Sequence, residues 1–229
     1  MATQIPLAER MRPHHIDAYI GQRHIVGEGA VLRNAIEQKN IPSMIFWGPP
    51  GVGKTSLALL SAKSLDRPFF SLSAIQAGVK DIREVIEKAE ALRNFNQEQP
   101  ILFIDEIHRF SKSQQDSLLG AVERGLVTLI GATTENPSFE VISALLSRCQ
   151  VYVLEHLSED DLKDILQQAI AKDSFLQAHP VEIAEYSALL RLSGGDGRKL
   201  LNVFELVVNA AHAQQKAITD AFVLKQVQQ

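Results

Sequence analysis

A phosphate-binding loop is the clearest chemical signal in the sequence. One contiguous run fits the pattern GxxxxGK[ST], and we count the residue after it, Ser56, with the same site. Its residues are Gly48, Pro49, Pro50, Gly51, Val52, Gly53, Lys54 and Thr55. Glycines let the backbone amides converge on phosphate oxygens, Lys54 would neutralise the terminal phosphates, and the Thr55 hydroxyl would ligate Mg²⁺. A glycine-rich turn that binds nothing is the alternative, and the strand and helix expected on either side of the loop argue against it.

Two adjacent carboxylates follow an apolar run further along the chain. Asp105 and Glu106 come directly after the run 101–104. Ligands of open α/β sheets bind at the carboxyl ends of the strands, so these side chains would lie beside the nucleotide. Asp105 would hold Mg²⁺, and Glu106 would orient and deprotonate the water that attacks the γ-phosphate of ATP. An acidic strand end that faces solvent is the alternative, which the preceding phosphate loop disfavours. The pair indicates a hydrolase.

The elements that must position these residues form an alternating pattern. Short β-rich apolar runs alternate with segments of helical period, which is typical of a parallel sheet covered by helices on both faces. The helix expected over 81–94 has its apolar residues three or four positions apart. The runs predicted as strands are 44–47, 69–72, 101–104, 127–132 and 149–154. The pattern predicts an α/β P-loop fold with a five-stranded parallel sheet.

A helical second part is expected after about residue 156. Ser158 and Asp161 form a capping pair before a stripe of apolar residues at helical spacing. Further segments are expected to continue this helical part: 181–192, a glycine turn at 194–197, 198–213, and a last helix capped by Thr219 with Ile218 and Val223 as a hydrophobic staple. We therefore predict two domains, a nucleotide-binding domain over 1–156 and a helical lid over 157–229.

Composition sets limits on the class of protein. The chain has 229 residues, 45% of them hydrophobic, which is enough for a sizeable core. A net charge of −4 gives no overall attraction to nucleic acid, so contact with DNA would need a local basic patch. Cys149 is the only cysteine, which excludes an intrachain disulfide, and His14 and His15 do not have zinc-ligand spacing. Without an apparent signal sequence or a long apolar run, we expect a cytoplasmic, nucleoid-associated protein that makes no membrane contact.

Several motifs together resemble one branch of the AAA+ ATPases. They are Asp105-Glu106-Ile107-His108-Arg109-Phe110, the run from Gly131 to Phe139, Ser147-Arg148-Cys149 and Gly195-Asp196-Gly197-Arg198. They look like the replication-associated recombination protein A family, the bacterial counterpart of the Werner-helicase-interacting ATPase. The chain is also similar to clamp-loader subunits and to the Holliday-junction branch-migration ATPase. The resemblance covers nearly the whole chain.

The resemblance implies roles for further residues. Thr134 matches sensor 1, whose hydroxyl reports the γ-phosphate, and Arg148 matches the arginine finger that reaches the nucleotide of a neighbouring subunit. Arg198 matches sensor 2 of the lid. Ile20 and Gly21 match the segment that closes over adenine, although an apolar turn packed on the core would explain them almost as well. For Thr134, Arg148 and Arg198, the flanking motifs favour these roles over a strand-end threonine and solvated surface arginines.

The resemblance also implies partners. We expect from it contact with single-stranded, gapped or forked DNA, a homo-oligomer in the full-length family, and contact with single-strand-binding protein or the replisome. Lys80 and Arg83, with Arg109 and Lys112, are the one local basic cluster that could follow a DNA backbone. A solvated helix face explains these residues about as well.

The expected function is a DNA-dependent ATPase that remodels or recruits proteins at stalled forks, gaps or recombination intermediates. Relatives carry a further C-terminal domain for oligomerisation, and we expect this chain to be the AAA+ core without it. The turn 122–126 is less acidic than the resemblance leads us to expect, and it suggests no function.

Two alternatives stay open, an ATP-binding scaffold with little hydrolysis and a branch-migration motor subunit. The sequence lacks the aromatic pore loop that a protein unfoldase needs and the base-reading motif of a guanine-nucleotide switch, so we set both functions aside.

Overall fold

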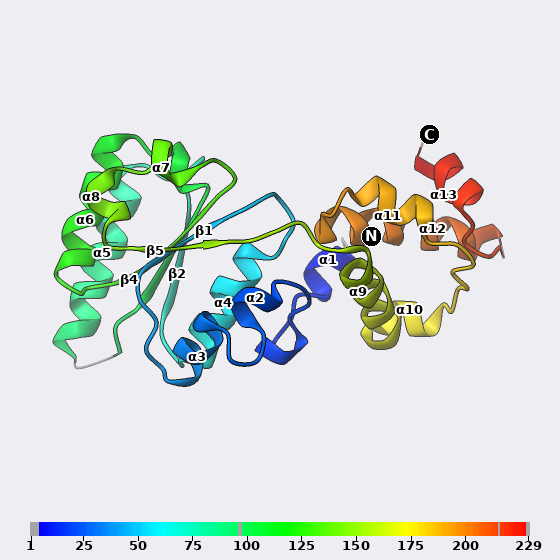
Figure 1. Ribbon diagram of the computed structural model, residues 1–229, viewed down its shortest axis with the longest axis horizontal. Coiled ribbons are helices and arrows are strands. Elements are labelled where there is room, and N and C mark those ends of the chain that lie inside the picture. The colour runs from blue at the N-terminus through cyan, green and yellow to red at the C-terminus, as the bar shows by residue number, and fades with distance from the viewer. Residues whose placement is uncertain (1–4, 96–97, 215, 228–229) are drawn as a thin grey trace. The chain divides into compact units, whose positions relative to one another are not determined.

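The computed structural model describes residues 5–95, 98–214 and 216–227 (Figure 1). Its internal contacts divide the chain into two units. The first unit holds the N-terminal segment up to Gly21, the short piece Pro50–Gly53 and the chain from His156 onward. The second unit holds Gln22–Pro49 and Lys54–Glu155. The boundary at 156/157 between a nucleotide-binding domain and a lid stays a prediction.

The second unit is built on a five-stranded parallel sheet, as predicted (Figure 1). The strand order is β2-β3-β4-β1-β5, so β4 lies between β1 and β3. All six residues of β4 are buried, which explains why its run is apolar without alternation. The strands are β1 Met44–Trp47, β2 Phe69–Ser73, β3 Ile101–Asp105, β4 Thr128–Thr133 and β5 Gln150–Val153.

Helices cover this sheet, and their start signals are local. Gly78 precedes α5, and its N–H donates to the Asp81 carboxylate at 2.7 Å, so the helix begins two residues before its predicted start at 81. Ser111 and Gln114 form a capping box before α6. The helical elements of this unit are α2 Arg23–Val26, α3 Val31–Glu37, α4 Lys54–Ser64, α5 Val79–Asn94, η2 Ile107–Arg109, α6 Lys112–Glu123, α7 Pro137–Glu140 and α8 Ser143–Leu146.

The first unit is helical. Its elements are α1 Leu7–Arg10, η1 Ile16–Ala18, α9 Glu159–Lys172, α10 Ser174–Ala178, α11 Ser187–Ser193, α12 Gly197–Gln214 and α13 Asp220–Val227. The two predicted caps are confirmed: the Ser158 hydroxyl accepts from the Asp161 N–H at 3.1 Å, and the Thr219 hydroxyl accepts from the Phe222 N–H at 3.3 Å. Ile218 and Val223 are both fully buried.

The prediction of helical structure over 181–192 is wrong in its first half. Ile183 forms an isolated parallel bridge with Ile218. The Ile218 N–H donates to the Glu182 carbonyl at 2.8 Å, and the Ala184 N–H donates to the Ile218 carbonyl at 2.9 Å. These long-range bonds use the backbone groups that a helix would need. The helix α11 begins only at Ser187.

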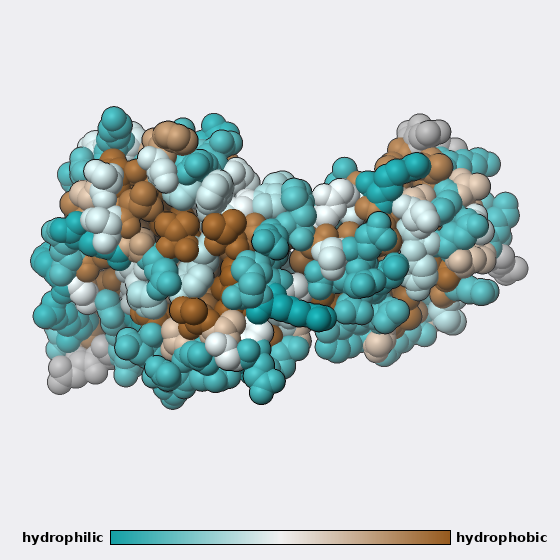
Figure 2. Space-filling model, viewed as in Figure 1, coloured by the Kyte–Doolittle hydropathy of each residue, from teal (hydrophilic) through white to brown (hydrophobic). Residues whose placement is uncertain are grey.

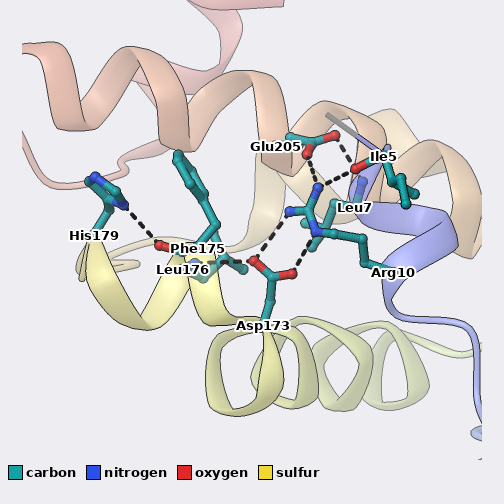
Figure 3. A network of polar contacts seen from close by, with 8 residues as sticks. All are labelled: Ile5, Leu7, Arg10, Asp173, Phe175, Leu176, His179 and Glu205. Carbon is teal, nitrogen blue, oxygen red and sulfur yellow. Dashed lines mark hydrogen bonds and ion pairs between the residues drawn. The ribbon is translucent and has the colours of Figure 1, made fainter. Parts of the chain in front are cut away.

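A charged network fixes α1 to the helices of the first unit (Figure 3). Arg10 Nε donates to Asp173 Oδ2 at 2.7 Å, and its Nη1 donates to Glu205 Oε1 at 2.9 Å. The Leu7 N–H donates to the other Glu205 oxygen at 3.0 Å, and the Leu7 side chain is fully buried. The hydrogen bond from Arg10 holds the pKa of Asp173 below its ordinary value. The N-terminal segment is therefore part of the packed helical unit.

The surface drawn in Figure 2 is mostly hydrophilic, with smaller groups of hydrophobic residues between the polar ones. Within the described ranges, no helix is both long enough and apolar enough to cross a membrane.

Candidate nucleotide-binding site

The phosphate loop follows β1 and leads into α4. Gly51 and Gly53 have φ angles of +68° and +99°, which favour glycine over residues with a side chain. Gly48 lies so close to the backbone after β5 that a Cβ there would come within 2.2 Å of the Leu154 carbonyl oxygen. The Lys54 ammonium is buried and donates to the carbonyls of Gly48 and Pro49, both at 2.7 Å. The loop backbone thus turns at Gly51 and Gly53, and the Lys54 ammonium is held by carbonyls at the start of the loop.

The piece Pro50–Gly53 packs within the first unit. The Tyr19 hydroxyl donates to the Val52 carbonyl at 3.1 Å, and a Cβ at Gly53 would lie 2.5 Å from that hydroxyl oxygen. Burial raises the pKa of Tyr19, so its hydroxyl stays a neutral donor. Sequence reasoning missed Tyr19, although it directly precedes Ile20 and Gly21.

Residues before and at the start of α12 lie against the same piece of the loop. The Gly197 N–H donates to the Gly51 carbonyl at 3.1 Å. A Cβ at Gly51 would fall 1.7 Å from Asp196 Oδ1 at the end of a side chain, and the φ of +68° favours glycine there in any case. Arg198 is exposed on the first turn of α12. Of the predicted adenine segment, Gly21 has a φ of +84° and lies against Leu157, and Ile20 is half-buried.

The predicted catalytic carboxylate follows β3. Glu106 has the left-handed backbone angles φ 55° and ψ 46°, unusual for a residue with a side chain. Its Oε2 lies 3.5 Å from the hydroxyl of Thr134, the residue that directly follows the neighbouring strand β4. The structure therefore brings two predicted site residues together. His108, for which we predicted no role, lies 3.2 Å from the same oxygen.

The residues predicted to hold Mg²⁺ have suitable chemistry. Asp105 ends β3 and Thr55 is the second residue of α4, and carboxylate and hydroxyl oxygens suit Mg²⁺. No cluster of three or more His, Cys, Asp or Glu that could hold a metal occurs in the described part of the chain. A site of few protein ligands completed by phosphate oxygens fits this ion, which commonly keeps several non-protein ligands.

Among the described residues, Arg148 makes no contact with Asp105 or Glu106 and instead contacts Glu123 and Ala144. Its Nη2 lies 2.5 Å from Glu123 Oε1, and its Nη1 donates to the Ala144 carbonyl at 2.7 Å. Glu123 belongs to the turn 122–126 that suggested no function. The Arg148 side chain is 41% exposed, so its guanidinium is accessible from solvent.

The basic residues expected to meet DNA lie on neighbouring elements. Lys80 and Arg83 are exposed on α5, and Arg109 and Lys112 are exposed in η2 and at the start of α6. The Gln114 side chain donates to the Ala77 carbonyl at 3.2 Å, which joins the start of α6 to the segment before α5. This bond brings the starts of α5 and α6, where these basic residues lie, close together.

Comparison with known proteins places this geometry in a family. The model of the ATPase family associated with various cellular activities (AAA) matches residues 44–157. The chain is 48% identical over 210 residues to the replication-associated recombination protein A of Coxiella burnetii, covering 90% of this chain and 47% of that protein. It is 46% identical over 209 residues to the protein of that name from Escherichia coli strain K12, covering 90% and 46%. The chain thus spans about half the length of these curated relatives.

A solved structure gives the same fold. The Thermotoga maritima RuvB Holliday junction branch migration motor superposes with a TM-score of 0.75 at 28% identity, covering 95% of this chain and 72% of that one. Together with the five-stranded sheet, the phosphate loop and the carboxylates after β3, these similarities establish that the chain belongs to the replication-associated recombination protein A family of AAA ATPases.

Proposed function

We propose that this chain binds and hydrolyses ATP in a DNA-dependent manner, and that hydrolysis drives remodelling or protein recruitment at stalled replication forks, gaps or recombination intermediates. The observation that carries the proposal is the pairing of Glu106 with Thr134 at the ends of adjacent strands, in a chain with a complete phosphate loop. A protein that only bound nucleotide would not need a carboxylate held in a strained backbone conformation beside a strand-end hydroxyl.

The residues of the site would divide the chemistry between them. The loop amides and Lys54 bind the phosphates, with Ser56 beside Thr55 in the first turn of α4. Mg²⁺, held by Thr55 and Asp105, would neutralise charge on the β- and γ-phosphates. Glu106 orients a water and accepts its proton, while Thr134 donates a hydrogen bond at the γ-phosphate.

Three further residues would couple the site to its surroundings. Arg198 contacts phosphate from the helical lid, and Ile20 and Gly21 contact adenine. Arg148 of one copy completes the site of another in a homo-oligomer, where it stabilises charge in the transition state. Its exposure, just after the end of α8, supports a role in trans.

Support for DNA as the partner comes from two sides. The curated relatives are named as replication-associated recombination proteins. The exposed basic residues on α5, η2 and α6 offer phosphate contacts on a chain whose net charge is −4. We propose single-stranded, gapped or forked DNA as the ligand, with single-strand-binding protein or the replisome as protein partner, in the cytoplasm at the nucleoid.

The test is steady-state ATP hydrolysis by the 229-residue chain with and without single-stranded or forked DNA. We expect DNA to stimulate turnover, and Glu106→Gln to lower kcat by at least about 100-fold while ATP affinity is kept. Glu28→Gln, the same chemical change at an exposed turn, is the matched control and should leave turnover unchanged.

Two other results would favour the alternatives. Tight ATP binding without turnover at any protein concentration would support an ATP-binding scaffold in place of the hydrolase. Stimulation by a four-way junction, with none by single-stranded or forked DNA, would support a branch-migration motor, the function named for the structurally similar RuvB.

A further inference from the structure

The polar surroundings of Glu106 include one residue that the proposed mechanism does not use. His108 lies in the 3-10 turn η2, and its side chain is only 6% exposed. Its Nδ1 lies 3.2 Å from Glu106 Oε2 and 2.9 Å from the Thr133 hydroxyl. Thr133 is the last residue of β4 and is fully buried. The same imidazole nitrogen thus contacts both the predicted general base, Glu106, and the buried hydroxyl at the end of β4.

The donors and acceptors around Nδ1 determine where its proton lies. The Thr133 hydroxyl donates to the Glu135 carbonyl at 3.2 Å and accepts from the Glu135 N–H at 3.0 Å. With its proton used in this way, Thr133 has one lone pair left and can only accept from His108. An ionised Glu106 carboxylate is also only an acceptor. Both neighbours therefore require a proton on Nδ1, which donates to them in a shared hydrogen bond.

The opposite tautomer is less favourable at each contact. If Nδ1 carried a lone pair, it would face the Glu106 carboxylate oxygen at 3.2 Å without a proton between them. The Thr133 hydroxyl would have to turn away from the Glu135 carbonyl to donate to the ring. Both changes remove hydrogen bonds at a nearly buried position, which costs free energy.

We propose that His108 is a positioning residue for ATP hydrolysis: its Nδ1–H holds Glu106 Oε2 in place and leaves Oε1 free to receive the proton of the attacking water. This inference rests on the proposed function and names a residue that sets the geometry of its general base. Glu106 is then fixed by its left-handed backbone and by His108 at 3.2 Å, while the single proton of the Thr134 hydroxyl serves the γ-phosphate. A base held in one orientation reacts faster than one that must find it.

Three variants of His108 separate hydrogen bonding from packing. His108→Asn keeps an N–H donor near the position of Nδ1, His108→Gln places its amide near the position of Nε2, and His108→Leu keeps volume without a donor. We expect His108→Asn to retain most of kcat, and His108→Gln and His108→Leu to lower kcat roughly tenfold or more. The dissociation constant for ATP should change little in all three, because His108 acts on the water and not on the nucleotide.

Combination with Glu106→Gln separates this inference from the proposed function. If Glu106→Gln keeps full turnover, the proposed function fails. If Glu106→Gln loses turnover but His108→Leu keeps it, or His108→Asn falls as far as His108→Leu, the positioning role is overturned while the hydrolase remains. The double variant Glu106→Gln/His108→Leu should be no slower than Glu106→Gln alone, since His108 acts through Glu106.

A measurement of the ring itself does not depend on turnover. Nitrogen-15 NMR of histidine-labelled protein distinguishes the two neutral tautomers, and the signal missing from His108→Asn assigns the residue. We expect the proton on Nδ1 in the wild-type chain. A proton on Nε2 would overturn the proposal, because Thr133 would then be the donor and Glu106 would have no bond from the ring.

Discussion

The hydroxyl of Tyr19 gives a test of how the phosphate loop is held. It donates to the Val52 carbonyl at 3.1 Å from a half-buried position. We expect Tyr19→Phe to lower the free energy of unfolding by about 1 kcal/mol, because the Val52 carbonyl loses its partner. ATP affinity should fall severalfold, because a less ordered loop must be ordered on binding. Thermal unfolding and titration calorimetry with ATP would measure the two effects.

Tyr152→Phe is the matched control for Tyr19→Phe. The Tyr152 hydroxyl is buried and has no hydrogen-bond partner among the described residues. Removing it should leave stability unchanged or slightly raised, and ATP affinity unchanged. No loss in Tyr19→Phe would show that Tyr19 contributes through its ring alone, and equal losses in the two variants would show that the bond to Val52 is not the cause.

At the scale of elements, the docking of α1 depends on Arg10 (Figure 3). Arg10→Met keeps the aliphatic stem but leaves Asp173, whose side chain is 4% exposed, without its cation. We expect a loss of about 3 kcal/mol in the free energy of unfolding at pH 7, measured by urea unfolding. Arg12→Met, which breaks an exposed pair with Glu9, should cost less than about 1 kcal/mol.

The pH dependence of this loss follows from the direction of the pKa shift. Arg10 lowers the pKa of Asp173 in the folded chain, so the pair's contribution is fully present above the unfolded carboxyl pKa of about 3.9. It disappears as the pH falls through the lower, folded pKa. The difference between wild type and Arg10→Met should therefore shrink below about pH 4. If the difference in the free energy of unfolding stays constant down to pH 2, the loss in Arg10→Met comes from lost packing and not from the ion pair.

The elements that sequence predicted well are those with local signals. Apolar runs placed all five strands within a residue or two, and Ser158 and Thr219 marked two helix starts. The pairing of Ile183 with Ile218 and the docking of Leu7 join distant segments and have no periodicity to read.

The same limit applies to the candidate site. The phosphate loop and the carboxylates after β3 were visible as contiguous motifs, and the approach of Thr134 to Glu106 follows from the parallel sheet. The contacts of His108 and Tyr19 have no signal in the sequence, although His108 lies within the motif 105–110 and Tyr19 lies beside Ile20 and Gly21. Motif spacing identifies the residues of a site but not which atom of each ring faces its partner.

At the scale of the whole molecule, the role of Arg148 predicts that sites are completed by a second copy. Glu106→Gln and Arg148→Ala should each abolish turnover alone. In a mixture, a subunit with Arg148→Ala keeps its Glu106, and a neighbouring Glu106→Gln subunit supplies Arg148 to it. We expect equal amounts of the two to recover activity at about a quarter of the interfaces, because a head-to-tail contact pairs the subunits at random.

This prediction is tested by measuring ATP turnover of the mixture and of each variant alone over a range of total protein concentrations. Recovered turnover should rise with concentration as copies associate, and each variant alone should stay inactive over the same range. Glu123→Gln frees Arg148 from its ion pair at 2.5 Å and should raise turnover of the otherwise unaltered chain if that pair competes with the neighbour's nucleotide. A mixture that stays inactive at every concentration, with active wild-type chain beside it, would show that Arg148 acts within its own subunit or not at all.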